Sequence, residues 1–468
     1  MQNGSILVLL VDGAAREATL FASIWFLIGG LDDLLVDAIY GWRALRGRLG
    51  AGAAPRPSLA DIPLPAEPPQ IALFVPAWDE SAVIEPMLRT ALERFDYPAY
   101  RIYVGTYPND PATIAAVVRI AASDARVRLV IGPDPGPTTK ADCLNTLWRA
   151  LLRDEMAEAT RFAAVALHDA EDVVHPQEFR VFAHMLEQHA AVQLPVLPLP
   201  HPASRWVSGH YCDEFAEAHG KQLVVRQTLG AGMPFAGVGC AIRRDMLGRI
   251  ADLRDGAPFD ASSLTEDYEL GLTVSAMGGR TAIARVAECP GGWPVAVRAY
   301  FPARFGAAVR QKARWMTGIA FAGWDRIGWA EPRHIADHWM RMRDRRATLA
   351  MPVLAVAYCA LVAWGASLVL HVTTGTQAPA LASAMHALLL ANAALLAWRA
   401  LIRAAFVWRA YGAAEAARSL PRVLVSNMVA LFAARRAVLL YLSMLAGGAL
   451  KWEKTHHQFP DLPESIAR

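Results

Sequence analysis

Charged residues are scarce in this sequence, and its cysteines form no metal-binding or disulfide pattern. Asp, Glu, Lys and Arg make up 19% of the 468 residues, against about 25% in soluble domains. The five cysteines are scattered without a CxxC pair: Cys143, Cys212, Cys240, Cys289 and Cys359. A disulfide-stapled domain and a zinc knuckle are therefore excluded, and a reducing compartment is favoured. The net charge of +3 is too small to indicate a nucleic-acid partner.

Hydrophobic residues make up 54% of the chain and are concentrated in four runs: 18–40, 347–372, 378–398 and 423–450. A membrane-spanning helix needs about 20 apolar residues. The second and third runs contain no Asp, Glu, Lys or Arg and are separated only by the turn 373–377. They predict a transmembrane hairpin.

The first and last apolar runs contain charged residues. Asp32, Asp33 and Asp37 interrupt the first run, so they must face other helices or lie near the lipid headgroups. A cleaved signal peptide is the alternative, but the run lacks a basic start and a clear cleavage site. Arg435 and Arg436 lie in the middle of the last run. Two arginines at the bilayer centre would be costly, so we predict an interfacial helix there.

Arginines flank the predicted spans on one side only. They follow the first span (Arg43, Arg46, Arg48), precede the second (Arg341, Arg343, Arg345, Arg346) and follow the third (Arg399, Arg403, Arg409). Because cytoplasmic flanks are enriched in Lys and Arg, we predict three spans with the N-terminus outside and the C-terminus in the cytosol. The expected segments are a span (1–42), a semi-rigid Pro-rich linker (43–69), a cytosolic domain (70–300), interfacial helices (301–346), a hairpin (347–400), and interfacial helices with a tail (401–468).

The cytosolic domain alternates strand-like and helix-like segments. Runs rich in β-forming residues occur at 71–75, 101–105, 127–131 and 163–169, with helical patterns at 82–95, 111–123 and 140–156. This alternation predicts an α/β domain with a mainly parallel sheet. Ligands of such sheets bind at the carboxyl ends of the strands, so the residues that follow each strand are the first candidates for function.

Acidic residues follow three of the predicted strands. They are Asp79 and Glu80 after the first, Asp110 after the second, and Asp169, Glu171 and Asp172 after the fourth. A single acid in such a place is often a helix N-cap, and Asp110 before a proline has that form. Three carboxylates within four residues repel one another and need a compensating cation. A divalent cation that bridges a diphosphate is the natural candidate.

Two further motifs lie beyond these strands. Glu266 and Asp267 open a helical pattern, either as a helix start capped by the preceding threonine or as a catalytic base at a helix N-terminus. Gln311, Arg314 and Trp315 place an amide, a forked cation and a flat ring on one helical turn. The arginine suits a phosphate and the tryptophan suits stacking on a sugar. Alone, this motif would fit an amphipathic interfacial helix better.

Taken in order, the acidic strand end, the DxD-like cluster, the TED and the QxxRW resemble the membrane-embedded processive glycosyltransferases of family 2, the family of cellulose, hyaluronan and chitin synthases. Within that family, the phrases FVPAWDE, KADCLN, HDAEDVVHP, SLTEDYELG and YFPARFGAAVRQKARW are most similar to the bacterial inner-membrane phage-adsorption protein B group. The resemblance extends over nearly the whole chain. It implies a GT-A nucleotide-sugar-binding fold in a multi-pass protein of the bacterial inner membrane.

The resemblance also implies a role for each motif residue. A UDP-sugar donor would be bound by Asp79, Glu80, Asp110, Lys140, Asn145, Gln311 and Arg314. Asp169 and either Glu171 or Asp172 would hold Mg²⁺ or Mn²⁺ on the diphosphate. Asp267, with Glu266 beside it, would be the general base. Trp315, Gly239 and Cys240 would face the acceptor. Position 79 is Asp where the family usually has Asn.

The implied reaction is an inverting sugar transfer from UDP to a growing exopolysaccharide or envelope glycan, with a possible export partner in the outer membrane. One alternative is transfer of a single sugar to a lipid carrier, although such enzymes usually lack QxxRW. The other is a non-catalytic membrane receptor or scaffold for an envelope complex. A scaffold would need neither the base nor the acidic cluster.

Three remaining patterns are expected to be structural. His168, His175 and His184 lack a metal-ligand spacing. Arg341-x-x-x-Arg345 has the spacing of the arginine pair of cyclic-di-GMP-binding PilZ domains, but the partner motif is missing, so we assign it to the flanking arginines. The run KWEKT at 451–455 is expected to anchor the chain at the membrane interface. No cyclic-di-GMP-sensing domain is expected.

Overall fold

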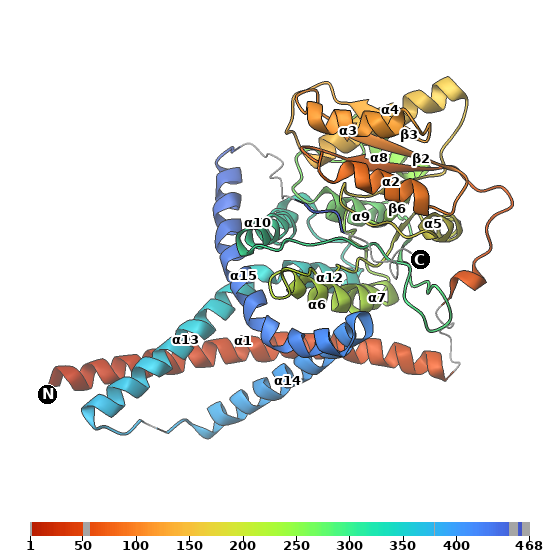
Figure 1. Ribbon diagram of the computed structural model, residues 1–468. Helices are drawn as coiled ribbons and strands as arrows, with labels where there is room; N and C mark the ends of the chain where they lie inside the picture. The colour runs from red at the N-terminus through yellow and green to blue at the C-terminus, as the bar shows by residue number, and fades with distance from the viewer. Residues whose placement is uncertain (1, 50–56, 379, 449–456, 461–468) are drawn as a thin grey trace.

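The computed structural model describes residues 2–49, 57–378, 380–448 and 457–460 (Figure 1). A sheet covered by helices forms one part of the molecule, and long helices form the other. The predicted α/β domain with a mainly parallel sheet is confirmed. The run KWEKT lies outside the described residues.

The sheet has seven strands in the order β3-β2-β1-β4-β6-β5-β7. They are β1 (Ile71–Pro76), β2 (Tyr100–Thr106), β3 (Val127–Ile131), β4 (Ala164–Leu167), β5 (Ala191–Gln193), β6 (Cys240–Arg243) and β7 (Thr281–Ile283). Only β6 runs antiparallel to its neighbours. The first four strands correspond to the predicted runs. The last three have three or four residues each, too few for a hydrophobic period to be recognised.

Both faces of the sheet are buried. Ile71, Leu73 and Val75 of β1 pack with α2 (Ile84–Arg94), α3 (Pro111–Ala121) and α5 (Glu178–Leu186). Ala72 and Phe74 face the other side, against α4 (Lys140–Glu158), α8 (Arg244–Asp252) and α9 (Glu266–Ala276). A strand buried on both faces is uniformly apolar, which explains the sequence IALFV. The polar residues are left at the carboxyl ends of β1 and β4.

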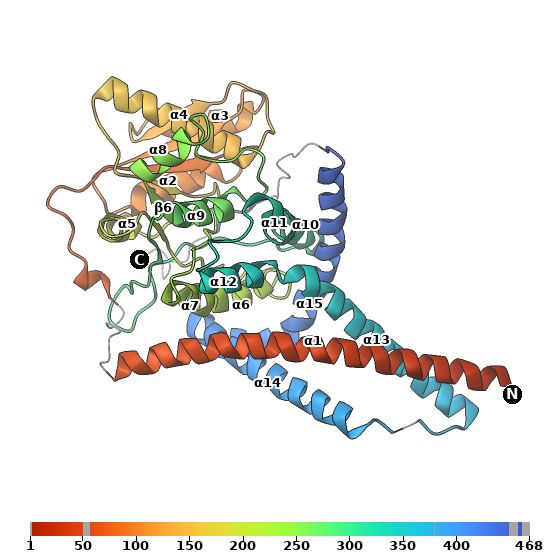
Figure 2. The same cartoon turned by 180° about the vertical axis from the view of Figure 1, so that it is seen from behind.

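Within the described part of the chain, four helices are long and apolar enough to cross a membrane, by length and composition. They are α1 (Gln2–Arg48), α13 (Ala347–Thr374), α14 (Ser383–Tyr411) and α15 (Ala413–Leu445). The predicted hairpin corresponds to α13 and α14. Figure 2 shows α1 passing beneath the α/β domain and beside α13.

The acids in the first apolar run face other helices. Asp33 lies 2.8 Å from the guanidinium groups of Arg343, Arg346 and Arg399. Asp37 pairs with the buried Lys221. This placement confirms one of the two positions expected for these acids, facing other helices, and connects α1 to the base of the α/β domain.

The predicted linker 43–69 is wrong at both ends. Helix α1 continues to Arg48, so its last turn is not part of a linker. Beyond the undescribed residues, a short 3₁₀ turn η1 (Leu59–Asp61) and the buried Ile62 pack on the domain. The Nε of Arg180 donates a hydrogen bond of 2.7 Å to the carbonyl of Ile62. The prolines predicted a semi-rigid spacer, but the burial of Ile62 holds the residues around it against the domain.

Two of the arginines assigned to the membrane flank belong instead to the domain. They lie on α12 (Ile335–Arg345). Arg341 is buried against Asp337, with 2.9 Å between Nε and Oδ2. Arg345 donates to two backbone carbonyls at 2.6 Å and lies over the rings of Trp324 and Trp329. These contacts explain their spacing without a nucleotide ligand or lipid headgroups.

Helix α15 packs along the α/β domain. Its Arg422 lies 3.1 Å from Asp213 of α6 (Gly209–Glu217). Its Val429, Ala433 and Ala437 pack on α10 (Phe305–Met316). In Figure 1, α15 turns away from α13 and α14 and rises beside α10. Its composition permits a membrane span, so the interfacial position stays a prediction, which the contacts with α6 and α10 favour.

Candidate active site

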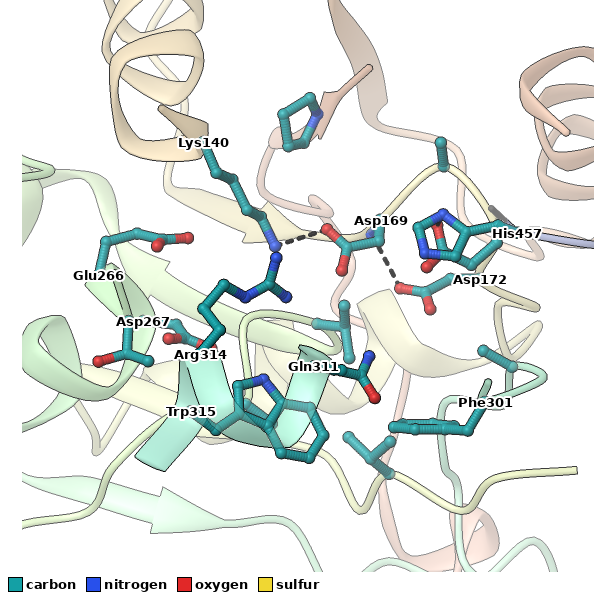
Figure 3. Close-up of a pocket in the computed structure, with 18 of the residues that line it drawn as sticks. Lys140, Asp169, Asp172, Glu266, Asp267, Phe301, Gln311, Arg314, Trp315 and His457 are labelled. Carbon is teal, nitrogen blue, oxygen red and sulfur yellow. Dashed lines mark hydrogen bonds and ion pairs between the residues drawn. The ribbon is translucent and has the colours of Figure 1, made fainter. Parts of the chain in front are cut away.

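A cavity of about 150 Å³ opens at the carboxyl ends of β1 and β4, between α9 and α10 (Figure 3). Most of the residues predicted for the site line it: Glu80, Lys140, Asp169, Glu171, Asp172, Glu266, Asp267, Gln311, Arg314 and Trp315. They come from five separate stretches of the chain. The fold thus brings motifs that are far apart in the sequence together in one site.

Glu266 and Asp267 occupy the first turn of α9. The side chain of Thr265 makes no capping hydrogen bond, which disfavours the simple cap interpretation. Burial raises the pKa of Asp267, while Lys140 opposes the shift. Burial and the charge of Asp267 raise the pKa of Glu266 to about 7. A carboxylate with a raised pKa is a better proton acceptor at neutral pH.

The chain passes very close to the Asp267 carboxylate at Gly237. This glycine has a φ of 74°, and a Cβ there would lie 2.6 Å from Oδ2 of Asp267. Only glycine permits both the left-handed backbone and this close approach. The glycine therefore helps to enclose the carboxylate.

Lys140, the first residue of α4, supplies a cation in the middle of the acids. Its Nζ lies 2.5 Å from Oδ1 of Asp169 (Figure 3). Burial opposes its charge, but Asp169, Glu266 and Asp267 outweigh burial and raise the pKa of the ammonium. Lys140 is therefore charged at neutral pH and suits a diphosphate.

The structure distinguishes the two acids that follow Asp169. Asp172 points into the core, where Oδ2 accepts a 2.9 Å hydrogen bond from the backbone N–H of Asp169 and lies 2.8 Å from Nδ1 of His168. Nε2 of His168 lies 2.8 Å from Glu178. Although burial opposes it, the two acids raise the pKa of His168 to about 10. Both acids line the cavity, but the carboxylate of Asp172 is engaged in shaping the loop.

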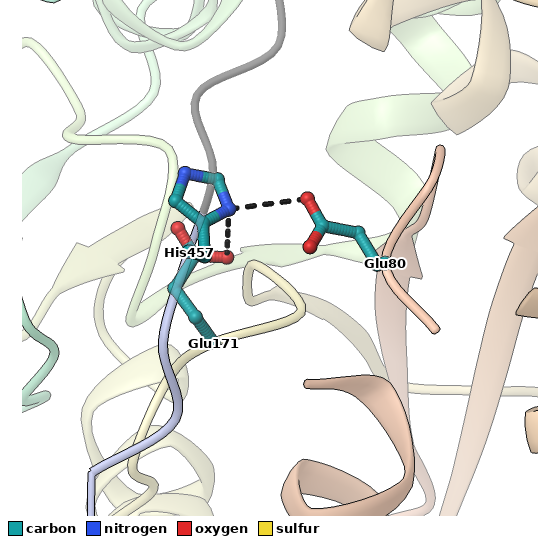
Figure 4. A group of neighbouring side chains, drawn as sticks. All are labelled: Glu80, Glu171 and His457. Carbon is teal, nitrogen blue, oxygen red and sulfur yellow. Dashed lines mark hydrogen bonds and ion pairs between the residues drawn. The ribbon is translucent and has the colours of Figure 1, made fainter. Parts of the chain in front are cut away.

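Glu171 meets a residue that the sequence did not reveal. Nδ1 of His457 lies 3.1 Å from Oε1 of Glu80 and 3.2 Å from Oε2 of Glu171 (Figure 4). Burial and the neighbouring acids raise the pKa of Glu171 to about 8, although His457 opposes the shift. Burial opposes charge on His457, but Glu171 and Glu80 raise its pKa to about 9. The segment HHQFP has no periodicity, so only its closeness to KWEKT could have drawn attention to it.

The QxxRW motif lies on helix α10 and lines the opposite wall of the cavity. Oε1 of Gln311 is buried without a hydrogen-bond partner among the described residues. The ring centroid of Trp315 lies 6.2 Å from that of Phe215 and 6.4 Å from that of Phe301. An unpaired buried acceptor is costly, so Gln311 suits a ligand that donates a hydrogen bond, such as a sugar hydroxyl.

Five predicted site residues do not line the cavity, and two of them shape it indirectly. Asp110 caps α3: its Oδ1 accepts from the N–H of Thr113 at 3.2 Å, and its Oδ2 accepts from the N–H of Asp79 at 2.6 Å. The capping alternative is therefore confirmed for Asp110. Asp79 itself is exposed with a φ of 54°. Their predicted nucleotide contacts stay predictions.

The other three of these residues lie in the core. Asn145 exchanges two hydrogen bonds with the backbone of Phe259, at 2.7 and 3.0 Å. Cys240 is fully buried in β6, and burial raises the pKa of its thiol. A Cβ at Gly239 would collide with Val297. The nucleotide contact of Asn145 and the acceptor contacts of Gly239 and Cys240 stay predictions, and the packing of these residues in the core gives them a structural role of their own.

The acids of the cavity suit a divalent cation. Carboxylate oxygens of Glu80, Asp169 and Glu171 are the ligands that Mg²⁺ and Mn²⁺ prefer. Ligand atoms of Glu80, Glu171 and His457 all lie within 4.8 Å of one another. The residues present therefore fit the group that the family resemblance implies.

A sequence profile described as "Glycosyltransferase like family 2" matches residues 68–318, more than half of the chain. The chain belongs to this glycosyltransferase family. The bacteriophage adsorption protein B of Escherichia coli (strain K12) is 35% identical over 466 residues, which cover 93% of this chain and 61% of that protein. The bacteriophage N4 adsorption protein B of Escherichia coli O157:H7 gives the same values. This glycosyltransferase thus spans about three fifths of the length of these relatives.

The fold is also found among solved structures. The mannosyltransferase PcManGT from Pyrobaculum calidifontis, in complex with GDP-Man and Mn²⁺, has a TM-score of 0.52 and 20% identity; the match covers 88% of this glycosyltransferase and 99% of that chain. At this identity the likeness concerns the fold alone. The GT-A fold class is confirmed.

Proposed function

We propose that this glycosyltransferase transfers a sugar from a UDP-sugar to a growing exopolysaccharide or envelope glycan, with inversion, at the cytosolic face of a bacterial inner membrane. The observation that carries the proposal is the meeting of Lys140, Asp169, Asp267 and Arg314 in one cavity. The two cations can bind a diphosphate, and the buried carboxylate can accept a proton. Transfer of a sugar from a nucleotide requires both functions.

The donor end of the cavity is formed by Lys140 and Arg314. Both present N–H groups to a diphosphate, and the guanidinium can do so with two parallel hydrogen bonds. Asp169 and Glu171 would hold Mg²⁺ or Mn²⁺, which when bound neutralises the diphosphate and so eases its departure. The complex of PcManGT with GDP-Man and Mn²⁺ supports a nucleotide-sugar donor with a divalent cation.

We assign the role of general base to Asp267, which lines the cavity and whose pKa is raised by burial. It accepts the proton of the acceptor hydroxyl while that oxygen forms a bond to the anomeric carbon. The bond from this carbon to the diphosphate breaks, and its electron pair leaves with the nucleotide. Attack opposite the leaving group inverts the anomeric centre. Such a base contributes about 10²–10⁴-fold to the rate.

The acceptor side is formed by Trp315, Phe215 and Phe301, with the unpaired Oε1 of Gln311 among them. Flat rings suit the apolar face of a sugar, and the amide oxygen suits one of its hydroxyls. Helix α10, which carries Trp315, packs on α15. An acceptor bound there lies next to the long apolar helices, as a membrane-associated glycan requires. An outer-membrane export partner would receive it.

A phage receptor or scaffold without catalysis is the second candidate, and the names of the curated relatives favour it. A scaffold has no need of the raised pKa of Asp267 or of an unpaired Gln311 acceptor. The arrangement of the cavity therefore favours catalysis. Transfer of one sugar to a lipid carrier would use the same residues.

Radiolabelled sugar transfer by the purified chain in nanodiscs separates these functions. UDP-glucose, UDP-N-acetylglucosamine and GDP-mannose are supplied with a membrane extract and Mn²⁺, and Asp267→Asn serves as the inactive control. Label in a long polymer from a UDP-sugar supports the proposal. Label in a single lipid-linked sugar supports the alternative transfer. No label above the control with any donor contradicts a catalytic function.

A further inference from the structure

A second cavity, of about 420 Å³, opens where the long helices meet the α/β domain. Residues of α1 and α14 line one side of it, and residues of the π-helical turn η2 (Ala218–Gln222) and of the segments after β5 and β7 line the other. Its aromatic and cationic lining residues are Tyr40, His219, Arg285, Trp293, Phe406 and Arg409. We propose that this cavity binds the phosphate of an anionic phospholipid headgroup.

The charges that line the second cavity are all positive. Arg285 follows β7 and Arg409 lies in the last turn of α14, and none of the described lining residues is acidic. Two acids on the neighbouring elements, Asp37 and Glu217, are already engaged with the buried ammonium of Lys221. Guanidinium groups bind phosphate oxygens through paired N–H groups. An anion is therefore the ligand that the charge of this cavity fits.

His219 adds a hydrogen-bond donor to the wall of the second cavity. The ring is buried, and its Nδ1 accepts a 3.2 Å hydrogen bond from the backbone N–H of Val196. Burial lowers the pKa of His219 to about 4, so the ring is neutral at pH 7 and carries its single proton on Nε2. No described residue accepts this proton. Because a buried donor without a partner is costly, Nε2 suits a phosphate oxygen.

The position of the second cavity favours a lipid as the source of the phosphate. Tyr40 and Arg409 follow the apolar parts of α1 and α14, at the ends that carry the flanking arginines. Figures 1 and 2 show both helices beneath the domain. The ring of Tyr40 lies against that of Phe406, with centroids 5.6 Å apart, and Trp293 is 44% exposed. Tyrosine and tryptophan are enriched at the level of the headgroups, and basic residues there attract anionic lipids.

One layer of residues separates the second cavity from the catalytic cavity. Pro195 and Leu197 line the second cavity, whereas Val196 between them lines the catalytic one. The ring of His219 stacks on Phe215, a residue of the proposed acceptor side, with centroids 5.2 Å apart. A headgroup bound to His219 would therefore restrain the wall on which the acceptor is proposed to lie.

Native mass spectrometry of the purified full chain in neutral detergent micelles tests the site, because it counts the lipids that a protein retains. The wild type is expected to retain one phosphatidylglycerol at concentrations at which phosphatidylcholine is lost. Arg409→Gln should weaken this retention by about tenfold, since a hydrogen bond to a charged group contributes a factor of this size. Ala410→Trp keeps the charges and fills the cavity, so it should abolish the retention.

Arg46→Gln is the matched control, because Arg46 is exposed in the last turn of α1 and does not line the cavity. It removes one charge from the same flank and should leave retention unchanged. Arg409 is also exposed, so neither replacement should change the unfolding temperature. That measurement separates loss of the lipid from loss of the fold.

Equal retention of the two lipids by the wild type would overturn the proposal. Retention of phosphatidylglycerol by folded Ala410→Trp at the wild-type level would also overturn it, because the lipid would then lie elsewhere. If inorganic phosphate or sn-glycerol 1-phosphate bound the wild type as tightly as phosphatidylglycerol does, a soluble phosphate would be the ligand and the lipid assignment would be wrong. None of these results depends on sugar transfer, so the lipid site and the proposed function fail separately.

Discussion

At the scale of single residues, Asp267 is the side chain whose replacement best separates binding from chemistry. Asp267→Asn keeps the shape of the side chain and removes its ability to accept a proton. We expect the variant to fold and to bind UDP with Mn²⁺ as the wild type does, while turnover falls by about 10²–10⁴-fold. Calorimetric UDP binding and labelled-sugar transfer measure the two effects. Turnover near that of the wild type would remove Asp267 from the role of base.

Asp169 and Asp172 are neighbours with opposite surroundings, and the same substitution should affect them differently. Asp169→Asn should weaken UDP binding in the presence of Mn²⁺ and leave it unchanged with a chelator, because Asp169 acts through the ion. Asp172→Asn removes a charged partner from the buried His168, so it should lower the free energy of unfolding by about 3–5 kcal/mol. Thermal unfolding measures this loss. If UDP binds equally well with and without divalent ions in the wild type, the metal assignment is wrong.

At the scale of helices and strands, the sequence was informative wherever an apolar run or a helical pattern extended over at least five residues. The runs at 71–75 and 127–131 and the helix at 140–156 correspond closely to β1, β3 and α4. Because ligands of parallel sheets bind at the carboxyl ends of the strands, the sequence also predicted the places of Glu80 and Asp169 in the cavity. The sequence did not indicate whether the side chains of Asn145 and Cys240 face the cavity or the core. A motif does not say which of its members points toward a ligand.

Gly318 determines how closely the QxxRW helix approaches the TED turn. It lies in the π-helical segment η3 (Thr317–Ala322) directly after α10, and a Cβ there would collide with the side chain of Thr265. Gly318→Ala should separate α10 from Asp267 and lower turnover by up to about 10²-fold, as misplacement of reacting groups does.

Gly306→Ala is the control for this change, since a Cβ at Gly306 has only the end of Arg310 within 4 Å. Its labelled-sugar transfer should equal that of the wild type. Equal turnover of Gly318→Ala and Gly306→Ala would show that the close approach of α10 to Thr265 is not needed for catalysis.

Arg422 connects α15 to the domain and should be essential for that connection. It is buried, within 3.1 Å of Asp213 and 3.0 Å of Glu415. Arg422→Met removes the cation that lies against the buried Asp213, whereas Glu415 keeps its ion pair with Arg418; loss of one partner of a buried ion pair costs about 3–5 kcal/mol. Arg435→Met, at an exposed position of the same helix, should change the unfolding temperature little. A similar loss in both variants would mean that α15 is not anchored through Arg422.

At the scale of the whole molecule, the position of both ends of α15 bears on topology. Its first turns contact α6 through Arg422, and the segment 457–460 beyond it lies in the catalytic cavity. The beginning of α15 and the segment 457–460 therefore lie on the side of the domain, whereas a single crossing by α15 would put them on opposite sides of a membrane. We infer that α1, α13 and α14 span the membrane and that α15 lies at its surface.

Cysteine accessibility in intact cells tests this topology, in a chain whose exposed Cys289 and Cys359 are replaced by serine. A cysteine at Thr374 should react with an impermeant reagent from outside. Cysteines at Ser204 and Gln458 should react only after the membrane is permeabilised. Reaction of the cysteine at 458 in intact cells would mean that α15 crosses the membrane.

The meeting of Glu80 and His457 also sets an order of events during synthesis. The two residues are 377 positions apart in the chain, and α13, α14 and α15 are encoded between them. Glu80 leaves the ribosome long before His457 exists, and His457 arrives only after the hairpin has been made. A nascent chain therefore cannot complete this wall of the cavity before its long apolar helices have been made. A nucleotide sugar would meet a complete cavity only in a chain that already carries those helices.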